Sequence, residues 1–295
     1  MKTERLAKRV LDPLSSPRTR RALIAARDQA TGTIAWATSK APVARTAPGF
    51  IVIGAQKGGT TFLFQELLTH PDVHGPLTKE LHYFDDRYAK GHDWYLGHFP
   101  PAARSGMAGE ASPSYLFHPY APARVARDLG PGTKVIAVLR EPVARAFSHW
   151  RHERRLGFEP IGEFPAAVAA EDERTAADLA RLADDPHFVS FAWRHHTYRA
   201  RGRYAEQLDR WQAALGPDRV LVLDSTDLYR NTAATLHRVH DFLGLGRFTA
   251  DQMGRNDMAA SDDEVLDSLF AEELGRYFEP WNRRLLDDYG IGGAW

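Results

Sequence analysis

Residues 50–61 constrain the fold of this chain more than any other segment. Their sequence, Phe-Ile-Val-Ile-Gly-Ala-Gln-Lys-Gly-Gly-Thr-Thr, predicts a buried strand, a glycine-rich turn and the first turn of a helix. Such a unit directs several backbone N–H groups and the positive end of a helix toward one point, which is how proteins bind a phosphate. We therefore expect an anion-binding loop that consists of Lys57, Gly58, Gly59, Thr60 and Thr61.

The same segment does not match an ATP-binding P-loop. In that motif, lysine and then serine or threonine follow the last glycine directly. With Gly54 and Gly59 as the loop glycines, Thr60 follows instead, and the lysine stands earlier, at position 57. A lysine inside the loop favours a leaving group different from that of ATP. The alternative interpretation is an ordinary tight turn between a strand and a helix, with an exposed lysine.

Composition restricts the class of protein. The 295 residues are 43% hydrophobic, which is enough for one large α/β domain or two small ones. Lysine plus arginine equals aspartate plus glutamate at 38 each, so the net charge does not indicate a nucleic-acid or membrane partner. The absence of cysteine excludes disulfides and thiolate metal sites, and it fits a reducing compartment, for which we expect the cytoplasm.

The first 47 residues differ in composition from the rest. They are rich in alanine, arginine, proline, serine and threonine, which predicts a helical or mobile leader over residues 1–47. Its basic start is not followed by the apolar core of a signal peptide, and no apolar run approaches the ~20 residues of a membrane span. A helix lying on a membrane surface is the alternative. Residues 48–295 show neither a repeat nor a second core, so we expect one domain.

Alternating strands and helices predict the fold class. Apolar runs at 50–53, 134–139 and 219–223 are typical of buried strands in a parallel sheet that is covered on both faces. A shorter strand is expected at 107–110. Helices are expected at about 59–69, after Pro142, and at 163–183, 204–215, 232–243 and about 262–288. This order predicts an α/β domain with a mainly parallel, doubly wound sheet.

The second strong strand ends in arginine rather than in an acid. In P-loop NTPases, an aspartate at a strand end helps to hold Mg²⁺. Arg140 stands in the corresponding place here, beyond the carboxyl end of a strand, where ligands bind in open α/β folds. Ser148, about two turns into the next helix, is within reach of the same anion. The alternative is a salt bridge between Arg140 and a local acid.

A polar loop contains Glu80, His82 and Asp85 within the sequence KELHYFD. A carboxylate in such a loop can act as general base for an acceptor hydroxyl. The alternatives are a solvated charged loop and a metal site from His82 and Asp85, although their spacing matches no strong metal motif. The pair His195 and His196 is expected on the surface or in core hydrogen bonds.

These segments, in this order, resemble the PAPS-dependent sulfotransferases, in particular the heparan sulfate N- and O-sulfotransferases and their bacterial relatives. Residues 56–61 are similar to the 5′-phosphosulfate loop of that family, and residues 79–85 are similar to the Lys-Glu-Pro-His-Phe-Phe-Asp segment of the 3-O-sulfotransferases. Residues 140–148 are similar to the 3′-phosphate site. Further similar segments lie at 91–95, 110–115, 202–211 and 220–224.

The resemblance implies 3′-phosphoadenosine 5′-phosphosulfate (PAPS) as donor, PAP as product, and no metal. It implies that Lys57 and residues 58–61 bind the 5′ end of the donor and stabilise the charge on the leaving phosphate. It further implies that Arg140 and Ser148 bind the 3′-phosphate. The sulfuryl group would move in line to a hydroxyl, or less readily an amine, of a small molecule, lipid or saccharide.

The resemblance also assigns the acceptor side of the reaction. Glu80 would take the acceptor proton, while His82 and Asp85 would shape the acceptor site. The alternative functions are an ATP-dependent phosphotransferase and a non-catalytic nucleotide-binding protein. No nucleic-acid partner and no integral membrane segment are expected, and the sequence does not indicate an oligomeric state.

The sequence departs from the animal enzymes in two ways. It lacks their cysteine-bracketed loop, for which residues 246–261, with Arg247, Arg255 and Asn256, are a shorter candidate. It also has Leu81 where the 3-O-sulfotransferases have proline. Because of both differences, the sequence does not identify the acceptor. Because loops build acceptor sites on a common scaffold, we expect segments 85–106 and 184–203 to form the wall, with Trp94, His187, Trp193 and Arg194.

Overall fold

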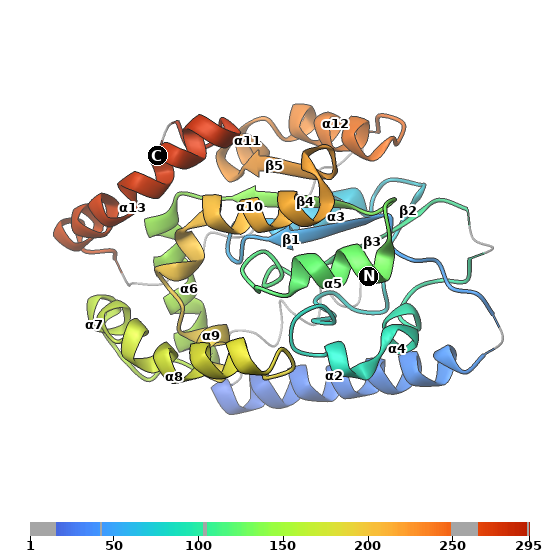
Figure 1. Cartoon of the computed structure of the whole chain (residues 1–295), viewed down its shortest axis with the longest axis horizontal. Helices are drawn as coiled ribbons and strands as arrows, with labels where there is room; N and C mark the ends of the chain where they lie inside the picture. The colour runs from blue at the N-terminus through green and yellow to red at the C-terminus, as the bar shows by residue number, and fades with distance from the viewer. Residues whose placement is uncertain (1–15, 42, 103–104, 249–264, 294) are drawn as a thin grey trace.

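A computed structural model describes residues 16–41, 43–102, 105–248, 265–293 and 295. Within these residues, strands form a five-stranded sheet in the order β2-β3-β1-β4-β5, and each neighbouring pair is parallel (Figure 1). The strands are β1 (Phe50–Gly54), β2 (Val73–His74), β3 (Met107–Ala111), β4 (Lys134–Leu139) and β5 (Val220–Asp224). This confirms the predicted α/β class with a mainly parallel sheet.

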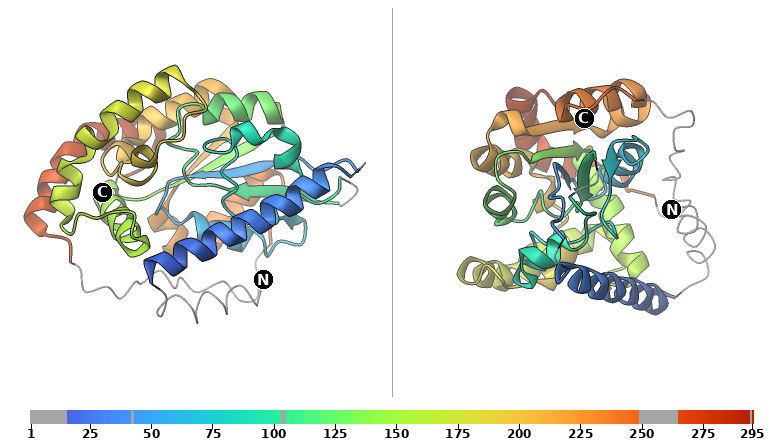
Figure 2. Two further views of the ribbon diagram at one scale, coloured as in Figure 1. Left: turned by 90° about the horizontal axis from the view of Figure 1, so that it is seen from below. Right: turned by 90° about the vertical axis from the view of Figure 1, so that its right-hand side faces the viewer.

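Alternating side chains of the central strand enter two different cores. Phe50 and Val52 of β1 belong to one hydrophobic cluster, while Ile51 and Ile53 belong to another. Because successive side chains of a strand point to opposite faces, the sheet must be covered on both sides. Figure 2 shows helices on both sides of the sheet, as expected for a doubly wound fold.

Each face of the sheet has its own helices. One cluster contains residues of α3 (Thr60–Leu67), α11 (Ser225–Arg230) and α12 (Thr232–Leu243). The opposite cluster contains residues of α4 (His92–Leu96), α5 (Ala121–Leu129), α10 (Tyr204–Leu215) and α13 (Ser268–Tyr289). The predicted bounds of α10 and α12 are confirmed, while α13 begins later than expected because Asp267 caps its first turn.

A third cluster packs α6 (Pro142–Leu156) against α7 (Phe164–Ala169) and the first half of α13. The expectation of a single exposed helix over 163–183 is wrong. The segment forms α7 and α8 (Glu171–Asp184), separated at Ala170, because Phe164 and Val168 are buried in this cluster. The remaining elements are the helix α9 (Phe191–His195) and the short 3₁₀ helices η1 (Tyr88–Lys90), η2 (Ala200–Gly202) and η3 (Pro217–Arg219).

The helix α2 (Pro17–Ser39) lies within the expected leader and runs along the lower side of the molecule in Figure 1. Its N-terminal half contacts the end of α6, since the Arg21 guanidinium donates to the Gly157 carbonyl at 2.9 Å. Farther along, Asp28 accepts from Arg87 at 2.6 Å, and the Thr38 hydroxyl donates to the Gly97 carbonyl at 2.7 Å. The helical part of the expected leader is thus docked on residues 48–295.

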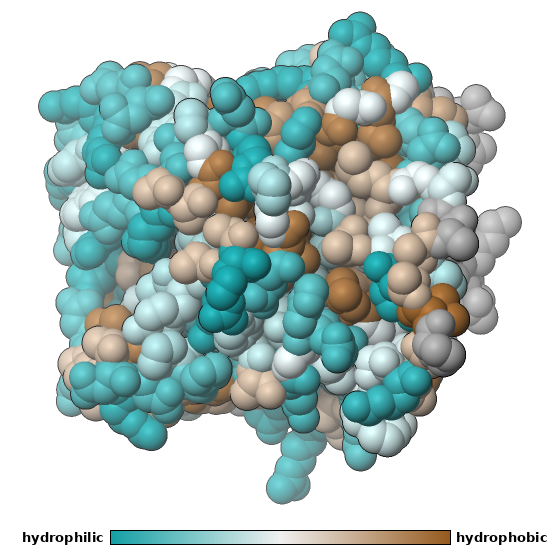
Figure 3. All heavy atoms as spheres, turned by 45° about the vertical axis from the view of Figure 1, so that its right-hand side comes forward, coloured by the Kyte–Doolittle hydropathy of each residue, from teal (hydrophilic) through white to brown (hydrophobic). Residues whose placement is uncertain are grey.

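Hydrophobic side chains gather in small patches among hydrophilic ones on the face shown in Figure 3. None of the helices within the described ranges combines the length and hydropathy needed to cross a bilayer.

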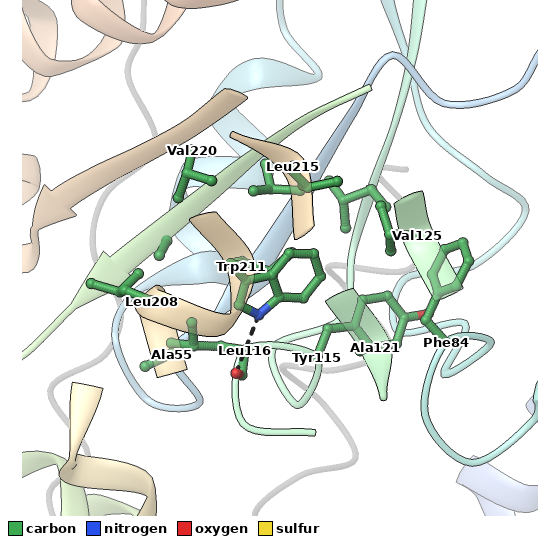
Figure 4. Close-up of a cluster of buried hydrophobic side chains, with 14 of the residues drawn as sticks. Ala55, Phe84, Tyr115, Leu116, Ala121, Val125, Leu208, Trp211, Leu215 and Val220 are labelled. Carbon is green, nitrogen blue, oxygen red and sulfur yellow. Dashed lines mark hydrogen bonds between the residues drawn. The ribbon is translucent and has the colours of Figure 1, made fainter. Parts of the chain in front are cut away.

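Trp211 on α10 is the largest fully buried side chain of the core. Its ring lies among Leu208, Leu215 and Val125, and its indole N–H donates to the Leu116 carbonyl at 3.3 Å (Figure 4). This packing joins the sheet to α5 and α10.

We expect Trp211→Ala to lower the free energy of unfolding by about 3–5 kcal/mol, because it leaves a large cavity in the core. Urea denaturation measures the change. The control is Trp36→Ala, because Trp36 is 59% exposed and surface substitutions usually change stability by less than about 0.5 kcal/mol. Equal effects of the two substitutions would contradict the central role of Trp211.

Candidate active site

The loop between β1 and α3 lies against the neighbouring strand β4. The Ala55 N–H donates to the Val138 carbonyl at 2.8 Å, and the Gly58 N–H donates to the Ala55 carbonyl at 2.9 Å. A Cβ atom on Gly58 would lie 2.2 Å from the Val138 oxygen, so glycine is required there. Gly59 has φ 108° and begins α3 without a side-chain cap, which leaves the N–H groups of the first helical turn available to an anion.

The Lys57 side chain is half-buried beside this loop, on a backbone with φ 69°. Loss of hydration lowers its pKa, the Arg155 and Arg140 charges lower it further, and the Glu153 and Glu80 charges oppose them, so the pKa is about 8. Lys57 is therefore still mostly a cation at neutral pH. Because these charges act on Lys57, the structure brings together the loop, the end of β4, the helix α6 and the polar loop that contains Glu80.

Arg140 follows β4 directly, and the Tyr204 hydroxyl donates to its carbonyl at 2.8 Å. The adjacent acid, Glu141, caps α6 by accepting from Val143 N–H at 2.8 Å and Ala144 N–H at 2.6 Å. Within the described ranges, no ion pair or hydrogen bond of the Arg140 guanidinium is found. The salt-bridge alternative for Arg140 therefore has no support, and the guanidinium is available to a ligand.

The helix α6 extends from Arg140 toward Lys57. Ser148, His152 and Arg155 recur along it at spacings of four and three residues, which places them on one face. Burial lowers the pKa of His152 to about 4, and the nearby Lys57 charge contributes to this shift. His152 is thus neutral at pH 7, and the face combines a hydroxyl, a neutral imidazole and a guanidinium.

The loop with Glu80 and His82 has an unusual backbone. Both residues have positive φ values, 64° and 53°. The Glu80 N–H donates to the carbonyl of Ala111 at the end of β3, at 3.1 Å. The Glu80 carboxylate is 43% exposed and accepts from the Lys79 ammonium at 2.6 Å. A partly exposed carboxylate is therefore held at the end of β3, close enough for its charge to act on Lys57.

The charge state of Glu80 follows from its neighbours. Removal from water raises its pKa, but the charges of Lys79 and His82 and the Lys79 hydrogen bond outweigh this effect and lower the pKa to about 2. Glu80 is consequently ionised at neutral pH.

The His82 ring is held by the carboxylate of Asp85. Its Nδ1 lies 2.9 Å from Asp85 Oδ2, and Ser114 also contacts this carboxylate. Burial raises the pKa of Asp85, but the charges of His82, His118 and Arg194 reverse this and hold the pKa far below its usual range. The structure thus brings Glu80, His82 and Asp85 together, as expected.

Arg194 of α9 completes this side of the site. One guanidinium nitrogen contacts Asp86, and another lies 3.2 Å from His82 Nε2. His82, Asp85 and Asp86 have ligand atoms within 4.8 Å of one another, a spacing that a metal ion could bridge. Arg194 already provides a positive charge to this group.

Glu153 is a site residue that sequence reasoning missed. It is buried on α6, with His195 Nδ1 at 2.8 Å, His149 Nε2 at 3.2 Å and the Gln56 amide at 3.4 Å. Glu153 thereby links α9 and the anion-binding loop. Burial raises its pKa, but hydrogen bonds and charge from the two histidines outweigh this effect and hold the pKa well below its usual range.

His195 therefore belongs to a core hydrogen-bonded group. His196 does as well, since its Nε2 lies 3.0 Å from the Phe158 carbonyl oxygen. The position of Glu153 within the helix expected after Pro142 gave no signal of its contacts.

The four residues expected in the acceptor wall lie in different places. Arg194 contacts His82 in the polar loop, whereas Trp193 stacks on Phe117 with ring centroids 4.3 Å apart. His187 stacks on Tyr88 at 6.0 Å. Trp94 is 9% exposed and lines a pocket of about 300 Å³. Neither Lys57 nor Glu80 lines this pocket. Its other lining residues are Trp36, Ser39, Lys40, Lys90, Gly91, His92 and Asp93.

Residues 246–248 of the segment 246–261, the candidate replacement for the cysteine-bracketed loop, are among the described residues. Arg247 forms a paired contact with Asp241, at 3.0 and 2.6 Å, rather than reaching toward the site. Arg255 and Asn256 lie outside the described residues.

Residues 47–264 match the family model of the sulfotransferase domain. The chain belongs to the sulfotransferase family. This agrees with the ordered motifs of the sequence, from the anion-binding loop to the arginine after β4.

Similar proteins include two groups of animal sulfotransferases. The chain is 31% identical over 220 residues to heparan sulfate glucosamine 3-O-sulfotransferase 6 of Mus musculus, covering 72% of this chain and 56% of that protein. It is 30% identical over 221 residues to bifunctional heparan sulfate N-deacetylase/N-sulfotransferase 3 of Homo sapiens, covering 70% of this chain and 23% of that protein. The match thus spans about half, or less, of these relatives.

Solved structures of sulfotransferases have the same fold. The sulfotransferase from Alicyclobacillus acidocaldarius is 29% identical, with a TM-score of 0.65 over 82% of this chain and 95% of that one. Mouse sulfotransferase SULT7A1, solved in complex with PAP, is 12% identical, with a TM-score of 0.50 over 84% of this chain and 88% of that one. At this identity, the second likeness concerns the fold alone.

The charge environment of Glu80 can be tested directly in this sulfotransferase. Because Lys79 lowers the Glu80 pKa, Lys79→Ala should raise it toward the ordinary value of about 4.3. Titration of the Glu80 carboxyl by ¹³C NMR should show no protonation of the wild type down to about pH 4 and the beginning of protonation in the variant. Lys90→Ala, a change in the separate pocket, should leave the titration unchanged. An unaltered Glu80 titration in Lys79→Ala would contradict the assigned ion pair.

Proposed function

We propose that this chain transfers a sulfuryl group from PAPS to an acceptor hydroxyl by in-line displacement, with Glu80 as general base. The observation that carries the proposal is the meeting of two anion-binding elements and one exposed carboxylate at the carboxyl edge of the sheet. Lys57 lies within the electrostatic reach of Glu80 and Arg140. The match of residues 47–264 to the sulfotransferase domain supports a sulfuryl donor of this type.

The donor is bound by two groups of residues. Lys57 and the backbone N–H groups of residues 58–61, together with the Thr60 and Thr61 hydroxyls, bind the 5′-phosphosulfate. The positive end of α3 favours the same anion. Arg140 and Ser148 bind the 3′-phosphate, where the arginine makes a forked, charge-assisted contact.

The chemical step forms one bond and breaks another. The acceptor oxygen attacks sulfur while Glu80 takes its proton, and the bond between sulfur and the bridging phosphate oxygen breaks. That oxygen leaves with the electron pair as part of PAP, and Lys57 stabilises its growing negative charge. The products are a sulfate ester and PAP, and Glu80 then releases its proton to water.

The bound donor also changes the base. With a pKa of about 2 in the free chain, Glu80 is a weak proton acceptor. The donor's negative charges lie near Lys57 and Glu80, and a nearby like charge raises the pKa of a carboxyl group. Donor binding therefore strengthens the base before the acceptor reacts. His82, held by Asp85 and Arg194, lies on the acceptor side of Glu80.

The acceptor is proposed as a class only. The names of the 3-O-sulfotransferase relatives describe a glucosamine hydroxyl as their acceptor position, which favours a hydroxyl over an amine. A saccharide, a lipid and a small molecule all offer such a group. An ATP-dependent phosphotransferase is the second candidate, but lysine is absent beside Thr60 and arginine follows the strand where that class places an acid.

Glu80→Gln should lower kcat by about 10²–10⁴-fold, because a positioned general base contributes that much. PAP affinity, measured by calorimetry, should remain close to that of the wild type. The control is Glu279→Gln, which neutralises an exposed carboxylate on α13. Retention of more than about half of the wild-type turnover would show that another group takes the proton.

Arg140→Ala should weaken PAPS binding about 10–100-fold, since a hydrogen bond to a charged group contributes roughly 1.5–3 kcal/mol. Binding of adenosine 5′-phosphosulfate, which lacks the 3′-phosphate, should scarcely change. The measured quantity is the ratio of the two affinities, with the exposed Arg283→Ala as control. Equal weakening of both ligands would make Arg140 structural. Tight ATP–Mg²⁺ binding by the wild type, without preference for PAPS, would favour the phosphotransferase.

A further inference from the structure

A buried acid without a cationic partner stands at the carboxyl end of β3. The Glu110 side chain is 0% exposed. Its carboxylate accepts hydrogen bonds from three hydroxyl groups: Ser112 at 2.7 Å, Tyr115 at 2.8 Å and Tyr95 at 2.6 Å. Within the described ranges, no lysine, arginine or histidine forms an ion pair or hydrogen bond with Glu110. A polar group in such a position is costly to bury, which calls for an explanation beyond packing.

The carboxylate determines which way these hydroxyl groups point. An ionised carboxylate can only accept, so each hydroxyl must direct its hydrogen toward Glu110. The oxygen lone pairs of two of them are then left for other donors. The His82 N–H donates to the Ser112 hydroxyl at 3.3 Å, and the Tyr83 N–H donates to the Tyr115 hydroxyl at 2.8 Å. Glu110 is thus linked to the backbone of the loop that contains Glu80 and His82 by two hydrogen-bond relays, one through the Ser112 hydroxyl and one through the Tyr115 hydroxyl.

The loop needs this support. Glu80 and His82 both have the left-handed backbone conformation, which costs of order 1–3 kcal/mol per non-glycine residue and persists only where the surroundings impose it. The Ala111 carbonyl, next to Glu110 in β3, binds the Glu80 N–H at 3.1 Å. Two consecutive residues of β3 therefore hold the loop. Ala111 binds the Glu80 N–H directly, and Glu110 acts on the N–H groups of His82 and Tyr83 through the two hydroxyl groups.

We propose that Glu110 is a positioning residue for sulfuryl transfer, which fixes the Glu80 and His82 side chains through the Ser112 and Tyr115 hydroxyl groups. This inference rests on the proposed function of Glu80. Burial raises the pKa of Glu110, and the three hydroxyl hydrogen bonds oppose that rise. Burial is the larger effect, so the pKa stays above its ordinary value, while the three hydroxyl groups act in favour of the ionised form.

Two tyrosines provide a matched pair of variants. Tyr115→Phe and Tyr95→Phe each remove one hydroxyl bond to Glu110 from a buried ring, but only Tyr115 also accepts from the loop. Tyr115→Phe should lower kcat by about 10–100-fold, because a misplacement of about 1 Å can cost 10²-fold. PAP affinity should stay near that of the wild type. Tyr95→Phe should leave kcat within about twofold, since a bond outside the relay does not orient the reacting groups.

Two further variants extend the test. Ser112→Ala removes the second relay and should resemble Tyr115→Phe. Glu110→Gln keeps one carbonyl oxygen that can accept from both Ser112 and Tyr115 and should retain more activity than either relay variant. Equal kcat values in Tyr115→Phe and Tyr95→Phe, or losses that follow thermal stability across all four variants, would overturn the proposal.

Hydrogen exchange separates this proposal from the function on which it rests. The Tyr83 amide should exchange faster in Tyr115→Phe than in the wild type, and at the wild-type rate in Tyr95→Phe. The measurement needs neither donor nor acceptor. If the wild type turned over no PAPS while exchange changed as expected, the proposed function would fail and the positioning of the loop would stand. Unchanged Tyr83 exchange in Tyr115→Phe would reject the relay itself.

Discussion

The parallel pairing of β1 with β4 decides where the loop with Lys57 lies relative to Arg140. Ile51 pairs with Val135 and Val52 pairs with Ile136, between two hydrophobic clusters that fix the register. Both strands then end at the same edge of the sheet, so the loop with Lys57 and the arginine after Leu139 leave it side by side. Two segments that are far apart in the sequence therefore lie together at the edge where ligands bind in open α/β folds, as the proposed donor site requires.

Charge at this edge is unevenly compensated. Arg194 has Asp86 as partner, and Glu80 has Lys79, but the pKa of Lys57 is lowered by Arg155 and Arg140 as well as by desolvation. Mutual repulsion of cations in a partly dehydrated site is relieved when an anion enters. A polyanionic donor should therefore raise the pKa of Lys57 and stabilise the site at the same time.

Three functional side chains, Lys57, Glu80 and His82, are carried by residues with positive φ. Each occurs in a loop that hydrogen-bonds to the end of a buried strand, as Ala55 does to Val138 and Glu80 does to Ala111. The sheet stabilises these left-handed backbone conformations, which the same loops would not keep without it. The acids Glu110 and Glu153 are buried in the same surroundings, and each is joined by hydrogen bonds to residues beside these loops.

The sequence by itself determined four of the five strands of the described sheet and the glycine-rich loop after β1, because apolar runs and glycine spacing are local properties; the two-residue strand β2 has too short a pattern to be read in this way. It also indicated Arg140, since the end of a strand can be read from the pattern. It did not reveal Glu110 or Glu153, whose partners come from separate segments, nor that Trp94 lines a pocket without Lys57 or Glu80 and that Trp193 stacks on Phe117. Burial and hydrogen-bond direction depend on which segments meet, and only the tertiary structure decides that.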